Sequence, residues 1–582
     1  MSYPKIPLAQ QVIQLCAAKG VSHVVISPGS RNAPLTIGFA SHPEIKTYSI
    51  VDERCAAFFA LGMAQELQQP VAVVCTSGSA LLNYYPAIAE AYYSRIPLIV
   101  ISADRPKHLI DVGDGQTIRQ ENVFENHILY TANLKQDLGE NNDRFSRRKD
   151  IPSFVLDKLL SISETRIDEN QGFINIAINI AIEKNGPVHI NVPFAEPLYE
   201  TQDSFTEEIT IVAPKKSADV LDRVHFNEFL ENWNSAEKRM VLIGVNTPHK
   251  IAQEFLDFLG NDSATIVFTE STSNVHHPNF FPGIDKIIAP LSDSEFSELQ
   301  PDILLTIGGL IVSKKIKVFL RNRKPKAHYH LGEDKAFDTF FCLKYHFKMT
   351  ENSFFKELCA SSVTIESGYQ TKWISVKNIR TEKHANYLAT LPHSDFKAFE
   401  AVLNTLPDNI VLHLSNSSTI RYIQLFDSNP NIVQYCNRGT SGIDGSTSTA
   451  IGHAAVSSVQ NVLITGDLSF FYDSNALWNT NIPKNFRIII INNSGGGIFR
   501  ILPGDKNTNI FETYFETTHN LTAKHLCKMY GIAYSVTSEE NSLKNELNNF
   551  FIAGDSPKLL EVFTPRIIND KLLVGYFSRL ID

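Results

Sequence analysis

The chain repeats one unit along its length: a short apolar strand, a loop of Gly, Ser or Asp, and an amphipathic helix. Apolar segments such as HVVISPGS (23–30), PLIVISADRP (97–106) and FRIIIINN (486–493) alternate with helical segments such as CAAFFALGMA (55–64). Strands of this kind, separated by helices, form parallel sheets that are covered on both faces. The sequence therefore predicts an α/β fold of doubly wound parallel sheets.

Two polar segments interrupt the repeats and divide the chain. Residues 194–219 (FAEPLYETQDSFTEEITIVAPKKSAD) are polar, contain prolines and are predicted to form a linker. Residues 364–389 are predicted to form a surface helix or a connector. We therefore expect three α/β domains of comparable size, which suits a chain of 582 residues. The expected ranges are 1–195, 196–375 and 376–582.

Composition argues against several classes of function. The net charge of −9, from 53 basic and 62 acidic residues, argues against a general nucleic-acid-binding surface. No run of about 18 apolar residues is present, so we expect no integral membrane segment. The N-terminal sequence also lacks a signal pattern. Seven scattered cysteines without CxxC spacing favour reduced thiols in a cytoplasmic protein and argue against a zinc site.

Short polar residues follow two apolar segments near the C-terminus. NVLITGD (461–467) ends in Asp467, and FRIIIINN ends in Asn493 and is followed by SGGG (494–497). Turn chemistry alone accounts for residues of these types at strand ends. Their pairing also suits a magnesium ion, because a carboxylate, an amide oxygen and a backbone carbonyl are hard oxygen donors. The remaining positions of the ion would be left to a diphosphate and water.

A single glutamate follows an earlier strand. In YSIVDERCAAFFALGMA (48–64), Glu53 stands at the start of a helix of small residues that should pack tightly against a neighbour. A lone Glu at a helix N-terminus is often only a favourable partner of the helix dipole. The helix alone leaves open whether Glu53 has a catalytic role.

Together these features resemble the thiamine-diphosphate enzymes, in which an N-terminal glutamate precedes an Ala/Gly helix and a C-terminal GD is followed by NN. Those enzymes pair a pyrimidine-binding domain, a central domain and a diphosphate-binding domain. The resemblance implies these roles for 1–195, 196–375 and 376–582, in that order, and a fold of three doubly wound parallel-sheet domains. It is weakest in the central range.

Further segments are similar to one subgroup of carboligases. They are SPGSRNAPL (27–35), DERCAAFFALGMA (52–64), TSGSALLNYYPAIAEAYYSRIPLIVISADRP (76–106), GQTIRQ (115–120), NRGTSGIDGSTSTAIG (437–452) and NNSGGGIFRILP (492–503). This resemblance implies a transferase of menaquinone biosynthesis that joins 2-oxoglutarate to isochorismate in a 1,4-addition, with loss of carbon dioxide. It also implies a homo-oligomer, dimer or tetramer, with active sites at the dimer interface.

The implied cofactors are thiamine diphosphate and Mg²⁺, for which Mn²⁺ can substitute. Glu53 would hydrogen-bond the aminopyrimidine ring and promote its imino tautomer, and the metal ligands would be Asp467, Asn493 and the carbonyl of Gly495. Leu468 replaces the glycine of the broader family's GDG, a replacement that the subgroup shares. The implied cofactor contacts are Glu53, Ser417, Gly442, Ile443, Asp467, Leu468, Ser469, Asn493, Gly495, Gly496, Ile498 and Phe499.

Both implied substrates are dicarboxylates, so the site should contain several cationic side chains. Arginines are preferred because one guanidinium group can donate two parallel hydrogen bonds to a carboxylate. Arg105 alone would more often be a surface charge, and Ile443 alone a core residue. Lys315 stands where the subgroup often has Arg. Lysine keeps the positive charge but lacks the forked guanidinium group of arginine. The implied substrate contacts are Ser30, Arg31, Arg105, Gln116, Lys314, Lys315, Ser417, Arg421, Arg438, Phe499 and Leu502.

Two alternatives remain at this stage. One is another thiamine-diphosphate carboligase or decarboxylase, such as an acetohydroxyacid synthase, although the several arginines speak against it. The other is a catalytically silent ligand-binding protein on the same fold, against which Glu53, Asp467 and Asn493 argue. The basic pair Arg147 and Arg148 could serve a regulatory anion or only be solvated surface.

Overall fold

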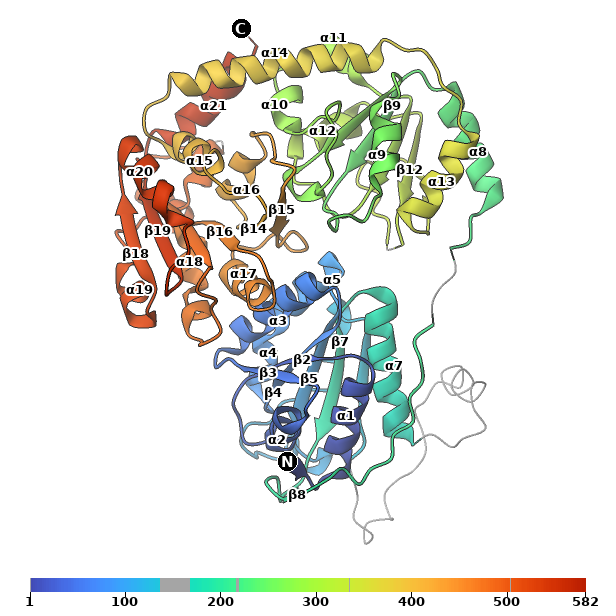
Figure 1. Cartoon of the computed structure of the whole chain (residues 1–582), viewed down its shortest axis with the longest axis vertical. Helices are drawn as coiled ribbons and strands as arrows, with labels where there is room; N and C mark the ends of the chain where they lie inside the picture. The colour runs from blue at the N-terminus through green and yellow to red at the C-terminus, as the bar shows by residue number, and fades with distance from the viewer. Residues whose placement is uncertain (1, 137–167, 216–218, 334, 503, 582) are drawn as a thin grey trace. The chain divides into compact units, whose positions relative to one another are not determined.

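The computed structural model describes residues 2–136, 168–215, 219–333, 335–502 and 504–581. The chain forms two compact units (Figure 1). Unit 1 comprises Met1–Ser217 together with Ser448–Ser457 and Asn475–Ile482. Unit 2 comprises Ala218–Thr447, Ser458–Ser474 and Pro483–Asp582. Arg147 and Arg148 lie outside the described residues.

Unit 1 is built on a six-stranded sheet in which every neighbouring pair is parallel. This confirms the predicted α/β class. In spatial order the strands are β3 (Lys46–Ser49), β2 (His23–Ile26), β4 (Val71–Cys75), β5 (Leu98–Asp104), β7 (Val188–Pro193) and β6 (Tyr130–Asn133).

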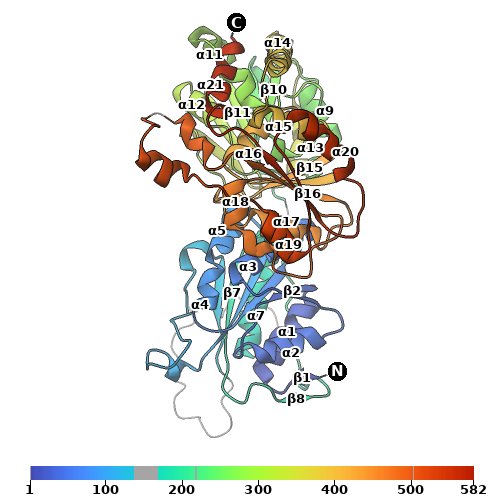
Figure 2. The same cartoon turned by 90° about the vertical axis from the view of Figure 1, so that its left-hand side faces the viewer.

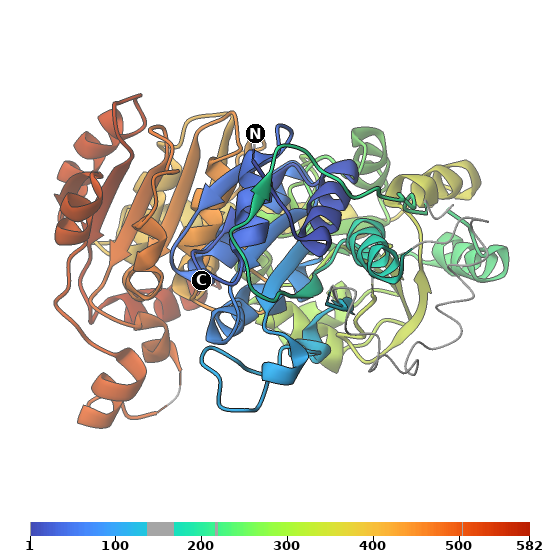
Figure 3. The same ribbon diagram turned by 90° about the horizontal axis from the view of Figure 1, so that it is seen from below.

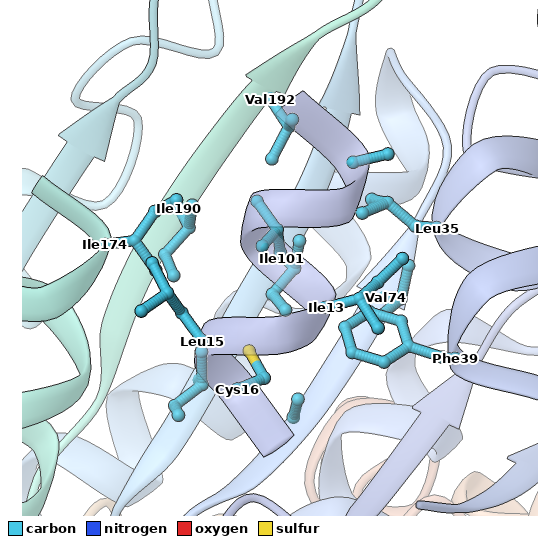
Figure 4. Packing of buried hydrophobic residues seen from close by; sticks show 14 of the residues in the cluster. Ile13, Leu15, Cys16, Leu35, Phe39, Val74, Ile101, Ile174, Ile190 and Val192 are labelled. Atoms are coloured by element: carbon cyan, nitrogen blue, oxygen red, sulfur yellow. The ribbon is translucent and has the colours of Figure 1, made fainter. Parts of the chain in front are cut away.

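Helices cover both faces of this sheet (Figures 2 and 3). One face carries α1 (Pro7–Ala18), α2 (Ala33–Ser41) and α7 (Glu169–Lys184), and the other carries α3 (Glu53–Leu67), α4 (Ser79–Asn83) and α5 (Tyr85–Ser94). Figure 4 shows the packing around α1, where Ile13 and Cys16 lie among Phe39, Ile101 and Ile190. Burial of this apolar surface is the main force that holds the helices to the sheet.

The small-residue helix α3 does pack tightly, as its sequence predicts. Its neighbour is α17 (Ser446–Ala454), part of which belongs to unit 1. A Cβ on Gly62 would lie 2.0 Å from the carbonyl oxygen of Thr449, and a Cβ on Gly452 would lie 2.0 Å from that of Phe59. The two backbones can approach this closely only because both positions are glycine.

Unit 2 contains two further parallel sheets. In spatial order, the central sheet consists of β10 (Thr265–Thr269), β9 (Arg239–Ile243), β11 (Ile303–Ile307), β12 (Ala327–Leu331) and β13 (Leu343–Phe347). The third sheet consists of β15 (Ile432–Cys436), β14 (Ile410–Leu414), β16 (Asn461–Gly466), β17 (Arg487–Asn492), β19 (Lys558–Phe563) and β18 (Ala533–Thr537).

The predicted connector at 364–389 is largely the 21-residue helix α14 (Tyr369–Ala389), which is prominent in Figure 1. The other main helices of unit 2 are α8 (Arg223–Ser235), α9 (Gln253–Gly260), α10 (Ile284–Ile288), α11 (Asp293–Leu299), α12 (Lys314–Asn322), α13 (Glu351–Ser361), α15 (Asp395–Leu403), α16 (Ser418–Ile423), α18 (Asp467–Tyr472), α19 (Lys524–Tyr530), α20 (Glu540–Phe550) and α21 (Asn569–Arg579). No helix among the residues described is long and apolar enough to cross a membrane.

The predicted linker is bound to unit 1 along much of its length. Strand β8 (Thr201–Gln202) pairs with β1 (Tyr3–Pro4). Further along, the backbone N–H groups of Thr206 and Thr210 donate to the side-chain oxygens of Gln10 and Gln171, both at 2.8 Å. Amide side chains on α1 and α7 therefore satisfy the backbone of a segment that has little secondary structure of its own.

All three sheets share the order of their first four strands. When the strands of each sheet are numbered along the chain, the first and third sheets both read 2-1-3-4-6-5, and the central sheet reads 2-1-3-4-5. In each sheet the direction of winding reverses between strands 1 and 3. Ligands of parallel α/β sheets bind in the crevice at this point, beyond the carboxyl ends of the strands.

In the central sheet the two loops at this point contact each other through their backbones. The Gly309 N–H donates to the Val245 carbonyl oxygen at 2.7 Å, which ties the loop after β11 to the loop after β9. A Cβ on Gly244 would lie 2.3 Å from the Gly309 carbonyl oxygen. The corresponding positions of the first and third sheets carry the polar residues described next.

Candidate active site

The polar ends of β16 and β17 meet, as the sequence predicts. The two strands are neighbours in register, with Gly466 opposite Ile491. Asp467 begins α18 and is only 3% exposed. Its carboxylate accepts the N–H of Leu468 at 2.7 Å and the N–H of Gly495 at 2.9 Å. A buried carboxylate therefore lies between the two strand ends.

Asn493 is oriented by a residue that the sequence did not single out. Its amide nitrogen Nδ2 donates to Asp395 Oδ2 at 2.9 Å. Because the two polar atoms of an amide point in different directions, this bond leaves the oxygen Oδ1 free to face another partner. Asp395 is itself buried, and burial raises its pKa to about 6.

The glycine run is required by a close backbone approach. Gly495 has φ of +150°, and a Cβ there would lie 2.7 Å from the Glu516 carbonyl oxygen. The Gly496 N–H donates to that same oxygen at 2.5 Å. The buried Glu516 carboxylate pairs with Arg500 and, at 2.9 Å, with Arg566. This pairing fixes the segment 511–516 against the glycines.

The donors at this edge fit a divalent cation with a diphosphate. They are one buried carboxylate, one amide oxygen and the backbone carbonyl of a glycine. Oxygen donors of this kind, few in number and leaving room for phosphate and water, suit Mg²⁺. His519 Nε2 also lies 3.3 Å from Asp467 Oδ2.

Asn416 and Ser469 connect the loops on the β14 side of the same sheet. Asn416 Nδ2 donates at 2.7 Å to the carbonyl oxygens of both Asn437 and Gly442. Ser469 Oγ donates to the Ile443 carbonyl oxygen at 2.7 Å, which joins this loop to α18. The Ile443 side chain is 37% exposed, so it is not a core residue of this unit.

Two arginines lie over these loops. Arg421 donates to the Ser417 carbonyl oxygen and Arg438 to Asn416 Oδ1, both at 2.7 Å. Desolvation, and next the charge of Arg438, lower the pKa of the Arg421 guanidinium. The Nε of Arg438 is buried and makes no hydrogen bond to any residue that the structure describes. Two neighbouring cations with an unused buried donor favour an anionic ligand.

Lys314 and Lys315 begin α12 and are exposed. The buried Glu270 carboxylate accepts the N–H groups of Val312 and Ser313, at 2.7 and 2.8 Å, just before these lysines. Burial raises the pKa of Asp285, whereas Lys315 and Arg421 both lower it. Lys315 and Arg421 therefore share an acidic neighbour, Asp285.

Glu270 should make the protein less stable as pH rises. Burial raises its pKa from 4.5 to about 7, so the folded protein holds this proton more tightly than the unfolded chain does. The resulting stabilisation is full below the unfolded pKa and is lost as pH rises through about 7. Between about pH 5 and pH 8, E270Q should gain stability over the wild type by on the order of 1–3 kcal/mol. Denaturant unfolding at several pH values tests this, and a difference that does not vary with pH would contradict it.

The apolar candidates Ile498, Phe499 and Leu502 lie in or beside the 3-10 helix η5 (Gly497–Ile501). The Phe499 ring is 6.2 Å from that of Phe515. Leu502 is 51% exposed, so the structure leaves an apolar surface beside the glycine run.

Glu53 opens α3 in unit 1, directly after the loop that follows β3. Asp52 caps the helix, because its side chain accepts the N–H of Cys55 at 3.2 Å. Burial raises the pKa of Glu53. Burial, and to a lesser extent the Glu53 charge, raise the pKa of the Cys75 thiol at the end of β4. A partly buried carboxyl whose pKa is raised suits proton exchange with a ligand.

A second arginine pair lies in unit 1. Arg31, only 5% exposed, donates to the Phe194 carbonyl oxygen at 3.0 Å and lies 3.2 Å from Glu196. Burial, and next the charge of Arg105, lower the pKa of Arg31. The Nε atoms of both arginines are buried, and neither has a hydrogen-bond partner among the described residues. Like the pair in unit 2, this pair favours an anionic ligand.

Ser30 and Gln116 are exposed residues of the adjoining loops. Gln116 has φ of +54°, and its carbonyl oxygen would lie 3.2 Å from a Cβ on Gly78. The sequence did not single out Gln120, which is fully buried. Gln120 accepts the Gly78 N–H at 2.8 Å and donates to Asn191 Oδ1 at 2.8 Å, so it anchors the loop that carries Gln116 to the sheet.

The fold and the match of one segment define the class of protein. Residues 6–129 match the family described as "Thiamine pyrophosphate enzyme, N-terminal TPP binding domain". Three parallel sheets with flanking helices agree with the architecture of thiamine-diphosphate enzymes.

Comparison of the whole chain narrows this class. The chain is 54% identical over 580 residues to a 2-succinyl-5-enolpyruvyl-6-hydroxy-3-cyclohexene-1-carboxylate synthase of Flavobacterium psychrophilum, with 100% of both chains covered. It is 55% identical to the synthase of the same name from Christiangramia forsetii, with 99% of each covered. The Porphyromonas gingivalis synthase is 35% identical, with 97% of this chain and 96% of the relative covered. The chain belongs to this family of synthases.

Proposed function

We propose that the chain joins 2-oxoglutarate to isochorismate in a 1,4-addition, releases carbon dioxide and forms 2-succinyl-5-enolpyruvyl-6-hydroxy-3-cyclohexene-1-carboxylate for menaquinone biosynthesis. The observation that carries the choice of substrates is the two arginine pairs, Arg31 with Arg105 and Arg421 with Arg438. Two dicarboxylate substrates bring four carboxylates, and paired guanidinium groups bind such anions well. A carboligase or decarboxylase acting on pyruvate would need fewer cations.

The proposed cofactors are thiamine diphosphate and Mg²⁺, with Mn²⁺ as a substitute. When bound, thiamine diphosphate supplies the electron sink for decarboxylation and carbon–carbon bond formation. Asp467, Asn493 and the Gly495 carbonyl would hold the ion on the diphosphate. Glu53 would hold a proton at the aminopyrimidine ring. Further cofactor contacts are proposed for Ser417, Gly442, Ile443, Leu468, Ser469, Gly496, Ile498 and Phe499.

The proposed substrate site combines the arginine pairs with polar and apolar neighbours. Ser30 and Gln116 would hydrogen-bond substrate, and Lys314 and Lys315 would add positive charge. Phe499 and Leu502 would form an apolar wall that excludes water. Ser417, which links Arg421 to the end of β14, would contact both cofactor and substrate.

We further propose a cytoplasmic homo-oligomer in which subunits share active sites. The proposed domains are 1–195 for the pyrimidine ring, a central 196–375, and 376–582 for the diphosphate. Glu53 belongs to unit 1 and Asp467 to unit 2, and in this proposal each site takes Glu53 from one subunit and Asp467 from another. Closed symmetric assemblies of this kind are common.

The reaction itself tests the proposal. Purified protein is incubated with isochorismate, 2-oxoglutarate, thiamine diphosphate and Mg²⁺, and the products are identified by mass spectrometry. We expect the succinyl adduct and one equivalent of carbon dioxide. Carbon dioxide without the adduct would favour a decarboxylase, and the absence of both would favour a silent binding protein.

Arg105→Lys should impair substrate use more than cofactor binding. Lysine keeps the charge but cannot form two parallel bonds to a carboxylate. Loss of a charged hydrogen bond costs about 1.5–3 kcal/mol, so kcat/KM should fall about 10- to 100-fold. Thiamine diphosphate affinity should change less than about twofold.

Arg119→Lys is the matched control for this variant. Arg119 lies on the same loop, but its side chain is 83% exposed and pairs with Asp111 at the surface. Steady-state kinetics with both substrates should leave Arg119→Lys near the wild type, because exposed ion pairs contribute little. Wild-type kinetics in Arg105→Lys would contradict the role of Arg105.

A further inference from the structure

Asp395 is a buried carboxylate held at the junction of three elements. It is the first residue of α15 and is 3% exposed. Its Oδ2 accepts the Asn493 amide at 2.9 Å, after β17, and its Oδ1 accepts the Thr564 hydroxyl at 2.5 Å, after β19. Its backbone N–H donates to Asn569 Oδ1 at 2.9 Å, at the start of α21. Asp395 is thus fixed before any ligand binds.

The chemistry of this contact determines which way Asn493 points. An amide side chain has an oxygen end and a nitrogen end of nearly the same shape. An ionised carboxylate only accepts hydrogen bonds, so Asp395 binds the nitrogen end and repels the oxygen end. Asn493 can therefore present its oxygen, not its nitrogen, to a cation beside Asp467.

A purely structural role would account for less of this arrangement. An acidic residue in the first turn of a helix is favourable because of the helix dipole. That effect needs neither burial nor a bond to a residue 98 positions away. Burying a carboxylate is costly unless all of its partners are in place. Both oxygens of Asp395 are satisfied, and one of them is committed to Asn493.

We propose that Asp395 is a positioning residue for the metal site, which sets Asn493 with its oxygen toward the cation. This inference rests on the proposed function, in which Asn493 is a ligand of Mg²⁺. Residues that orient a ligand from behind commonly change metal affinity 10- to 100-fold when they are replaced.

The test is the Mg²⁺ dependence of thiamine diphosphate binding in the absence of substrates. Asp395→Asn has almost the same shape but can present either end of its amide to Asn493, so it no longer selects the orientation. We expect the Mg²⁺ concentration for half-maximal cofactor binding, measured by calorimetry or fluorescence, to rise about 10-fold or more. Asp395→Ser serves the same purpose if the first variant does not fold.

Thr564→Val is the matched control. It removes the other hydrogen bond of the same carboxylate without touching Asn493. Its Mg²⁺ requirement should stay within about threefold of the wild type, while its melting temperature reports the structural cost. A larger shift in Asp395→Asn than in Thr564→Val, at similar melting temperatures, supports positioning.

Two results would overturn the inference, and they are distinguishable from failure of the proposed function. Wild-type Mg²⁺ dependence in Asp395→Asn would remove the positioning role and leave the metal site intact. Equal shifts in both variants, in proportion to their melting temperatures, would reduce Asp395 to a structural residue. Wild-type protein that binds thiamine diphosphate equally with and without a divalent ion would instead overturn the metal site on which the inference rests.

Discussion

Replacing Asp467 with alanine should abolish Mg²⁺-dependent binding of thiamine diphosphate. Asp467 is the carboxylate among the three proposed ligands, and it lies buried between the ends of β16 and β17. Loss of the charge removes most of the attraction for a hard divalent cation. We expect the affinity for the cofactor with Mg²⁺ to fall at least about 100-fold, since replacement of residues behind a ligand alone costs 10- to 100-fold. Calorimetric titration measures this directly.

Asp467→Asn separates the effect of losing the negative charge from the effect of losing a hydrogen-bond acceptor. The alanine variant leaves the N–H groups of Leu468 and Gly495 without their acceptor, which costs about 1–3 kcal/mol of stability. Asparagine keeps an oxygen in that position and should fold more like the wild type, yet it should still bind the cofactor weakly. Unchanged affinity in both variants would refute the metal site.

Replacing Glu53 with glutamine should slow proton exchange at C2 of bound thiamine diphosphate. The amide cannot hold and release a proton at the pyrimidine ring, and loss of such a group typically costs about 10²- to 10⁴-fold in rate. The cofactor itself should still bind, because the proposed metal ligands lie in unit 2. Hydrogen–deuterium exchange followed by NMR measures the rate without substrates.

Asp52→Asn is the matched control for Glu53. Asp52 is the adjacent carboxylate, and its side chain caps α3. Asparagine is an equally good helix cap, so this variant should keep wild-type exchange. If Glu53→Gln also kept wild-type exchange, the catalytic role of Glu53 would have to be abandoned.

Mixing Glu53→Gln subunits with Asp467→Ala subunits tests whether two subunits share each active site. If each site takes Glu53 from one subunit and Asp467 from its partner, a mixed dimer contains one intact site. Random pairing would then restore about a quarter of wild-type activity. Verified mixed dimers without activity, or a fully active monomer, would contradict this arrangement.

The sequence predicts the interior of the fold better than its margins. Apolar strands such as β5 and β17 were predicted because both of their faces are buried. Among the described residues, the pattern does not reveal β6, β13, β15 and β18, which are edge strands of the three large sheets, or the two-residue strands β1 and β8, which pair with each other. Edge strands are partly solvated and carry polar residues, so their apolar signal is weak.

Local sequence also reveals only some of the residues of the candidate site. Asp467, Asn493 and Glu53 stand directly at strand or helix ends, and local sequence reveals that position. Asp395 and Gln120 act through partners far along the chain, such as Asn493 for Asp395. Nothing in their neighbouring residues distinguishes a buried polar group with partners from an exposed one. Such residues can be found only once the fold brings the partners together.

The three sheets share the order of their first four strands, so differences in ligand binding between them must come from the loops. Under the proposed function, the loops of the first sheet would present Glu53 to the pyrimidine ring, and the loops of the third sheet would present oxygen ligands to the metal ion. In the central sheet, the two loops at the same point contact each other through their own backbone at Gly244 and Gly309. At this position the loops of the central sheet therefore hold each other, whereas under the proposed function the loops of the other two sheets would hold a ligand.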